Sequence, residues 1–126
     1  MAQDSIRYQT NETLGVGCRV TTITVSTTHS TLDTLLNAAV SGRASMPGRR
    51  SLTLRNLDST NPFYITESAS QTDTDGWNVE AGEDIKFEAS ESFTDNLSDY
   101  SIANGGGGFY LVCDSGTISV KVLEVK

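Results

Sequence analysis

Apolar and polar residues alternate along most of this chain, a pattern typical of strands that bury one face. The alternation is clear in residues 19–27 (RVTTITVST) and 51–57 (SLTLRNL), and in the second run Leu52 and Leu54 share a face with Asn56. Threonine and β-branched residues are common in these runs, and both favour the pleated strand. Further strands are predicted at 5–10, 63–66, 77–79, 84–89, 109–114 and 117–125.

Two pairs of these strands are predicted to form hairpins. The stretch 49–68 (RRSLTLRNLDSTNPFYITES) places two alternating runs around a polar loop, and the Asn-Pro in that loop forbids a helix. The last two strands are separated only by the turn letters DSG, which favour a tight hairpin loop. In addition, the letters EAGE predict a turn between the strands at 77–79 and 84–89.

One helix is predicted among the strands, in residues 30–42 (STLDTLLNAAVSG). Ser30 or Thr31 can cap its amino end with a hydroxyl oxygen, and Gly42 fits the left-handed residue that ends a helix. A short amphipathic helix of this kind plugs an open end of a sandwich or covers a sheet edge, which requires no ligand. Its apolar stripe consists of Leu32, Leu35, Leu36, Ala39 and Val40.

Short strands with regular turns predict an all-β fold, a β-sandwich or jelly-roll-like barrel of about seven or eight strands with one short α-helix. The length of 126 residues fits one domain with its own core. The glycines of LGVGC indicate a bend or a loose arm, so we expect an N-terminal arm (1–18) and a single β-sandwich domain (19–126).

No segment has the about 20 apolar residues of a membrane span, and the first ten residues lack the apolar core of a secretion signal. We therefore expect no membrane partner and synthesis in a cytoplasm.

Charge is distributed unevenly. The formal net charge is −7, yet residues 1–55 hold six arginines against three acids, whereas residues 67–99 hold ten acids and one lysine. This asymmetry predicts two faces of opposite sign, unless folding mixes the two segments in space. Nucleic acid is not an expected partner, because phosphate binding needs a concentrated basic surface.

The chain offers little catalytic or metal-binding chemistry. His29 is the only histidine, so neither a catalytic triad nor a histidine metal site can be assembled from a second one. Cys18 and Cys113 have no metal-site spacing, and the sequence leaves open whether they pair. The letters DTDG at 73–76 match only a fragment of a calcium loop, and a plain Asp-Gly turn is the other interpretation. We predict no enzyme, no metal and no cofactor.

Two groups of residues are candidates for binding. Arg43, Arg49, Arg50 and Arg55 fall within thirteen residues that contain no acid. Because arginine pairs with carboxylates across interfaces, these four are predicted interface residues; the alternative is a solvated strand edge that discourages aggregation. Separately, Trp77 with Tyr100 could stack against a sugar ring, or both could pack in the core or at a sheet edge.

The order of elements resembles a known family. The helix TLDTLLNAAV leads into RRSLTLRNLDSTNPFYIT, then into the turn and strand AGEDIKFE, and finally into GTISVKVLEV. Over residues 20–126 this resembles small β-sandwich virion structural proteins of tailed bacteriophages, including capsid decoration (cement) proteins. The insertion at 90–108 departs from the compact pattern.

The resemblance implies a non-enzymatic virion protein made in the host bacterial cytoplasm. Its implied partners are the major capsid protein or other virion proteins, and a homo-oligomer is implied, for which a trimer is one candidate symmetry. The alternatives are a tail or neck structural subunit, or a receptor- or glycan-binding module of the tail tip.

Overall fold

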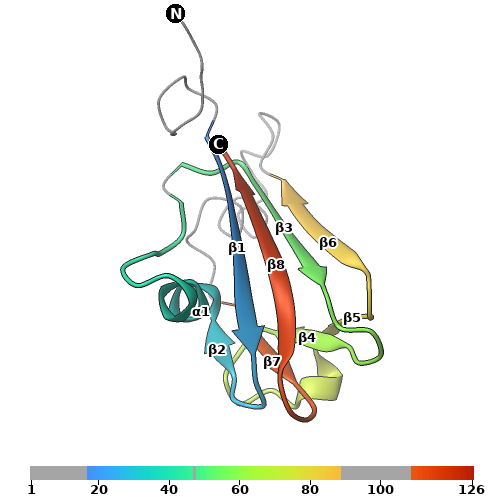
Figure 1. The fold of residues 1–126 in the computed structure, drawn as a ribbon. Helices are drawn as coiled ribbons and strands as arrows, with labels where there is room; N and C mark the ends of the chain where they lie inside the picture. The colour runs from blue at the N-terminus through green and yellow to red at the C-terminus, as the bar shows by residue number, and fades with distance from the viewer. Residues whose placement is uncertain (1–16, 47, 89–108) are drawn as a thin grey trace, which may run out of the picture.

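The computed structural model describes residues 17–46, 48–88 and 109–126, which form two antiparallel sheets of four strands each (Figure 1). Sheet A has the order β1 (Cys18–Val25), β8 (Ile118–Val125), β3 (Ser51–Asn56), β6 (Asp84–Glu88). Sheet B has the order β2 (Ser30–Thr31), β7 (Tyr110–Cys113), β4 (Phe63–Thr66), β5 (Trp77–Val79). The all-β prediction is confirmed, as a sandwich-like fold of two open sheets.

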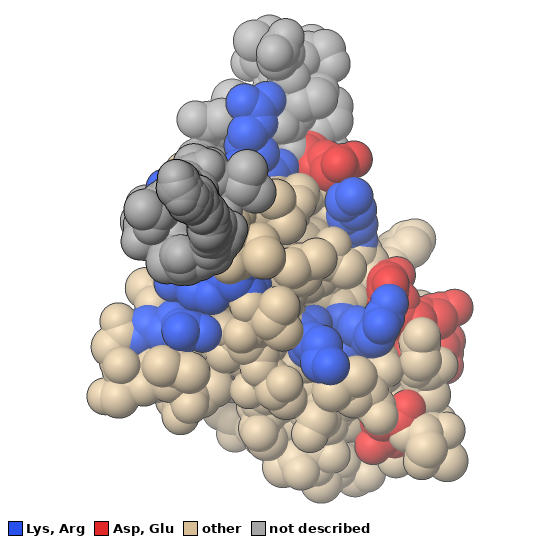
Figure 2. All heavy atoms as spheres, turned by 45° about the horizontal axis from the view of Figure 1, so that its top comes forward, with Lys and Arg blue, Asp and Glu red and all other residues tan. Residues whose placement is uncertain are grey.

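β1 begins and β8 ends at the same end of the sandwich, which Figure 2 turns toward the viewer. These two strands pair over their full length, from Cys18 opposite Val125 to Val25 opposite Ile118. The predicted N-terminal arm lies outside the described residues except at its end, where β1 already begins at Cys18.

Both predicted hairpins are wrong, because the strands of each pair lie in different sheets. β3 belongs to sheet A and β4 to sheet B, and β7 and β8 are divided in the same way. The alternation of apolar and polar residues shows only which side chains face the core. The same pattern is expected whether the next strand along the chain pairs with this one in the same sheet or packs opposite it in the other sheet. The loop after β3 therefore crosses the about 10 Å between two packed sheets.

A buried amide holds this crossing in place. Asn56 ends β3, is 1% exposed, and donates from Nδ2 to the carbonyls of Asn61 and Val79, both at 2.9 Å. Its Oδ1 accepts from the N–H of Asp58 at 2.8 Å, and Asp58 Oδ2 accepts from the N–H of Asn61 at 2.7 Å. Asn56 thus joins the end of sheet A to β5 of sheet B, and every polar atom of its side chain has a partner.

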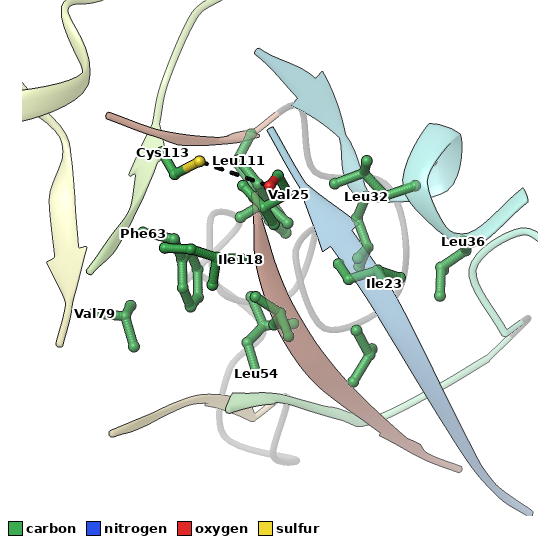
Figure 3. Packing of buried hydrophobic residues seen from close by; sticks show 14 of the residues in the cluster. Ile23, Val25, Leu32, Leu36, Leu54, Phe63, Val79, Leu111, Cys113 and Ile118 are labelled. Atoms are coloured by element: carbon green, nitrogen blue, oxygen red, sulfur yellow. Dashed lines mark hydrogen bonds between the residues drawn. The ribbon is translucent and has the colours of Figure 1, made fainter. Parts of the chain in front are cut away.

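The core lies between the sheets and is built from the inward rows that the alternation predicts (Figure 3). Leu52 and Leu54 are fully buried, and Ile85 and Phe87 of β6 pack against the same cluster while remaining half-buried. Cys113 is buried, with its thiol directed at the Val25 carbonyl 3.6 Å away, and Cys18 is exposed, so the structure contains two free thiols. Other members of the cluster are Ile23, Val25, Leu36, Phe63, Val79, Leu111, Ile118, Val120 and Val122.

The helix α1 (Leu32–Ala39) packs against β1 and β2, so it covers the side of the sandwich where these two edge strands lie (Figure 1). Thr31 caps it, because its Oγ1 accepts from the N–H of Thr34 at 3.2 Å. Gly42 has φ +83°, as predicted for the residue after the helix. The buried stripe ends earlier than predicted: Leu32, Leu35 and Leu36 are buried, whereas Ala39 and Val40 are exposed because the helix ends there.

Candidate functional site

A buried ion-pair cluster is centred on Glu124, near the end of β8. Glu124 continues the inward row of Val120 and Val122, yet its side chain is charged and fully buried. Its carboxylate lies 2.6 Å from Arg49 Nη1 and 2.8 Å from Arg19 Nη2, and Arg19 Nε also donates to it at 3.0 Å. Such a carboxylate is tolerated in a core because cations and hydrogen bonds replace its water.

The same cluster holds the loop between α1 and β3. The backbone N–H of Met46 donates to Glu124 Oε2 at 2.8 Å, and the Arg19 guanidinium donates to a loop carbonyl. Asp33 on the helix accepts from the backbone N–H of Ser45 at 2.9 Å and also from the Ser45 hydroxyl. These bonds hold residues 44–46 of the loop against β1, α1 and β8.

The structure separates the four arginines that were predicted to form an interface. Arg49 is 2% exposed and belongs to the Glu124 cluster, whose acid lies far away in the sequence. Arg43 donates to the Thr21 hydroxyl at 2.8 Å, and the side chain of Arg50 is exposed. An interface role for these residues stays a prediction, with Arg50 the most accessible of the three.

Arg55 lies at the opposite end of β3, where it pairs with Asp84 on the neighbouring strand β6. Arg55 Nε and Nη2 donate to the two carboxylate oxygens at 2.7 and 3.0 Å. This hydrogen-bonded pairing lowers the pKa of Asp84 and raises the pKa of Arg55. Both side chains are exposed, so the pair contributes little to stability.

Several basic residues lie close together at one end of the sandwich. Arg19, Arg49 and Arg50 lie where β1 begins and β8 ends, and Lys126 lies beside them because its N–H donates to the Gly17 carbonyl. Figure 2 shows basic side chains across this basic end, with acidic atoms mainly toward the right-hand side.

The other end of the sandwich is acidic. Asp114 follows β7, and Asp73 begins the short 3-10 helix η1 (Asp73–Asp75). A hydrogen bond between the Asp73 and Asp114 carboxyls lowers the pKa of Asp73 and raises the pKa of Asp114, and Tyr64 Oη donates to Asp114 at 3.3 Å. His29 lies nearby, with Nε2 2.8 Å from the Gln71 carbonyl. In the three described segments, no three His, Cys, Asp or Glu side chains converge as metal ligands.

An open groove of about 590 Å³ lies where the chain crosses from β5 to β6, at the side of the sandwich opposite α1. Trp77 on β5 is 68% exposed and lines it, so in this structure Trp77 is not a core residue. Its predicted stacking partner, Tyr100, lies outside the described residues. The predicted turn before β6 is confirmed, with Gly82 at φ +81°. The groove residues are Trp77, Asn78, Val79, Glu80, Glu83, Asp84, Ile85 and Lys86.

Glu124 and Arg19 were not among the predicted site residues, although the sequence contains a signal for Glu124. Glu124 lies two residues after Val122 and four after Val120, so the alternation of the strand predicts that its side chain also points inward. The cluster joins Glu124 to Met46 and Arg49, which lie more than seventy residues away in the sequence, so no local run of charged residues marks it.

Among the residues that the structure describes, no helix is long and apolar enough to cross a membrane. Comparison of the chain with protein-family models, with curated proteins and with solved structures finds no match.

Proposed function

We propose that this chain is a non-enzymatic structural protein of a tailed-phage particle and binds the outer surface of the capsid. The observation that carries the proposal is the basic end, where Arg50 is exposed and Arg19, held by Glu124, is partly exposed in a protein of net charge −7. A guanidinium that is already held in place, as that of Arg19 is, loses little side-chain freedom when it meets a carboxylate on a partner. The resemblance of the sequence to capsid decoration proteins supports the same role.

The mechanism is attachment of a rigid sandwich through the basic end and the N-terminal residues. A capsid presents many identical sites, so an interface of modest strength gives high occupancy when copies also contact each other. Because exposed charges are screened by salt, attachment weakens as the salt concentration rises.

The test is binding of the purified chain to expanded capsids that lack it, with the number of copies per capsid measured. Arg50→Gln is expected to weaken binding about fivefold, which corresponds to about 1 kcal/mol. Thr74→Glu changes the net charge by the same amount at the exposed surface of the acidic end and serves as the control. An affinity for capsids that changes neither with salt concentration nor in Arg50→Gln would contradict the mechanism. No binding to capsids at all would contradict the capsid role.

A second candidate is a receptor-binding module of the tail tip that recognises a surface glycan. The exposed indole of Trp77 in an open groove is the observation that favours it. Binding on a glycan array that is lost in Trp77→Ala and kept in Leu57→Ala, a second exposed apolar residue, supports this candidate. The position of the chain in a cryo-EM map of the particle distinguishes a capsid protein from a tail or neck subunit.

A further inference from the structure

The groove between β5 and β6 has a composition that points to a particular ligand chemistry. Its lining includes Val79, which is 2% exposed, and Ile85, which packs against the core, so part of it is apolar. Trp77 stands at the edge of sheet B with most of its indole exposed. The turn after β5 adds the carboxylates of Glu80 and Glu83. Apolar contact, an aromatic face and negative charge are thus combined in one place.

Two of the groove carboxylates have no cationic partner within the described part of the chain. Asp84 is already paired with Arg55, and Lys86 with Glu88 at 3.3 Å. By contrast, Glu80 and Glu83 make no salt bridge to any residue that the structure describes.

The contacts of these two carboxylates are local hydrogen bonds. Glu83 Oε1 accepts from the backbone N–H of Glu80 at 3.0 Å, and Glu80 accepts from the Asn78 amide. Each of these bonds uses one carboxylate oxygen, and the other oxygen has no donor among the described residues.

We propose that this groove binds a cationic side chain, an arginine or a lysine, of a partner protein. A long basic side chain has an aliphatic stem and a charged head. The stem suits the apolar part of the groove, and the head can stack on Trp77 while it pairs with Glu80 and Glu83. A sugar ring would use the indole, but a neutral sugar would leave both carboxylates without a counter-charge. This inference does not depend on capsid attachment, because the groove and the basic end use different residues.

Trp77 also provides the readout, since it is the only tryptophan in the chain. The full-length protein is titrated with a short arginine-rich peptide, and with a glutamine-containing peptide of equal length as the neutral probe. Indole fluorescence and the indole N–H signal in NMR spectra both report on Trp77. The arginine peptide is expected to give a saturable change in both signals, and the neutral peptide is expected to give none.

The double variant Glu80→Gln/Glu83→Gln is expected to weaken peptide binding at least fivefold, because the amides keep their local hydrogen-bond acceptors but lose the charge. Glu67→Gln/Asp75→Gln removes the same charge from exposed positions outside the groove lining and is the matched control. Trp77→Ala, followed by calorimetry, is expected to weaken binding by a similar factor.

An equal loss of binding in the control variant would overturn the proposal, because it would show diffuse attraction to net negative charge. Absence of any change at Trp77 would overturn it as well, as would a neutral glycan that saturates the indole signal and competes with the peptide. Self-association that is lost in the groove variant and kept in the control would support the proposal and identify a second copy as the partner.

Discussion

The buried carboxylate of Glu124 yields the sharpest stability prediction. Glu124→Gln keeps the shape of the side chain but replaces one acceptor oxygen by an amide that faces the donors of Arg19 or Arg49. Removing one partner of a buried ion pair costs about 3–5 kcal/mol, since the remaining charge stays in the core. The side chain of Arg19 is 25% exposed and can turn partly to water, whereas that of Arg49 is only 1% exposed and cannot. We therefore expect a loss of about 3 kcal/mol.

The free energy of unfolding is measured by urea denaturation, with far-UV circular dichroism as the signal. Glu88→Gln is the control: Glu88 pairs with Lys86 at 3.3 Å, both side chains are more than half exposed, and the expected change is within about 0.5 kcal/mol. The double variant Glu124→Leu/Arg49→Met is expected to recover most of the loss of Glu124→Leu, because it leaves neither charge buried. A loss below about 1 kcal/mol in Glu124→Gln, or equal to that of Glu88→Gln, would refute the reasoning.

Three further predictions concern the acidic end, the close approach of Gly76 to β4, and the thiols. The raised pKa of Asp114 means that its protonated form stabilises the fold below the unfolded pKa of about 4 and that this contribution is lost as pH rises. Asp114→Asn, which keeps an acceptor for Tyr64, should therefore raise the urea midpoint at pH 7 and not at pH 3; a lower midpoint at pH 7 would contradict this. Gly76→Ala should cost about 1–3 kcal/mol in the same assay, because a Cβ there would lie 2.5 Å from a backbone oxygen, and an unchanged midpoint would contradict it. With a thiol reagent, Cys18 should react in the native protein, because it is exposed. Cys113 should react only on unfolding, because it is buried and burial raises the pKa of its thiol. Rapid reaction of both thiols in the native protein would contradict the fold.

The strands and the helix could be predicted from the sequence because their signals are local. The inward row of Leu52 and Leu54, and the cap at Thr31, depend on neighbours only a few residues away. Sheet membership depends on partners far along the chain, so the crossings after β3 and β7 could not be read from alternation. Turn letters were also ambiguous: Gly76 has φ −82°, and it is needed because the backbone of Ile65 approaches closely, not because a left-handed turn requires it.

The candidate site was predicted only in part, for a related reason. The arginines were conspicuous because they are close together in sequence, but their acidic partners are not. Arg49 is buried because it pairs with Glu124, an acid that lies far away in the sequence. Trp77 was identified as a candidate ligand contact, but its exposure depends on the position of β5 at an open edge, and no local pattern encodes that position.

The pairing of β1 with β8 has a consequence for how the chain folds during synthesis. Among the strands that the structure describes, β1 pairs only with β8, which is the last of them along the chain. β8 also separates β1 from β3, so sheet A cannot be completed before nearly all 126 residues are made. Until β8 has been made, β1 lacks the strand with which it pairs. Pairing of strands so far apart in sequence makes folding slow for a protein of this size. Truncation after Thr117 would therefore remove an interior strand of sheet A.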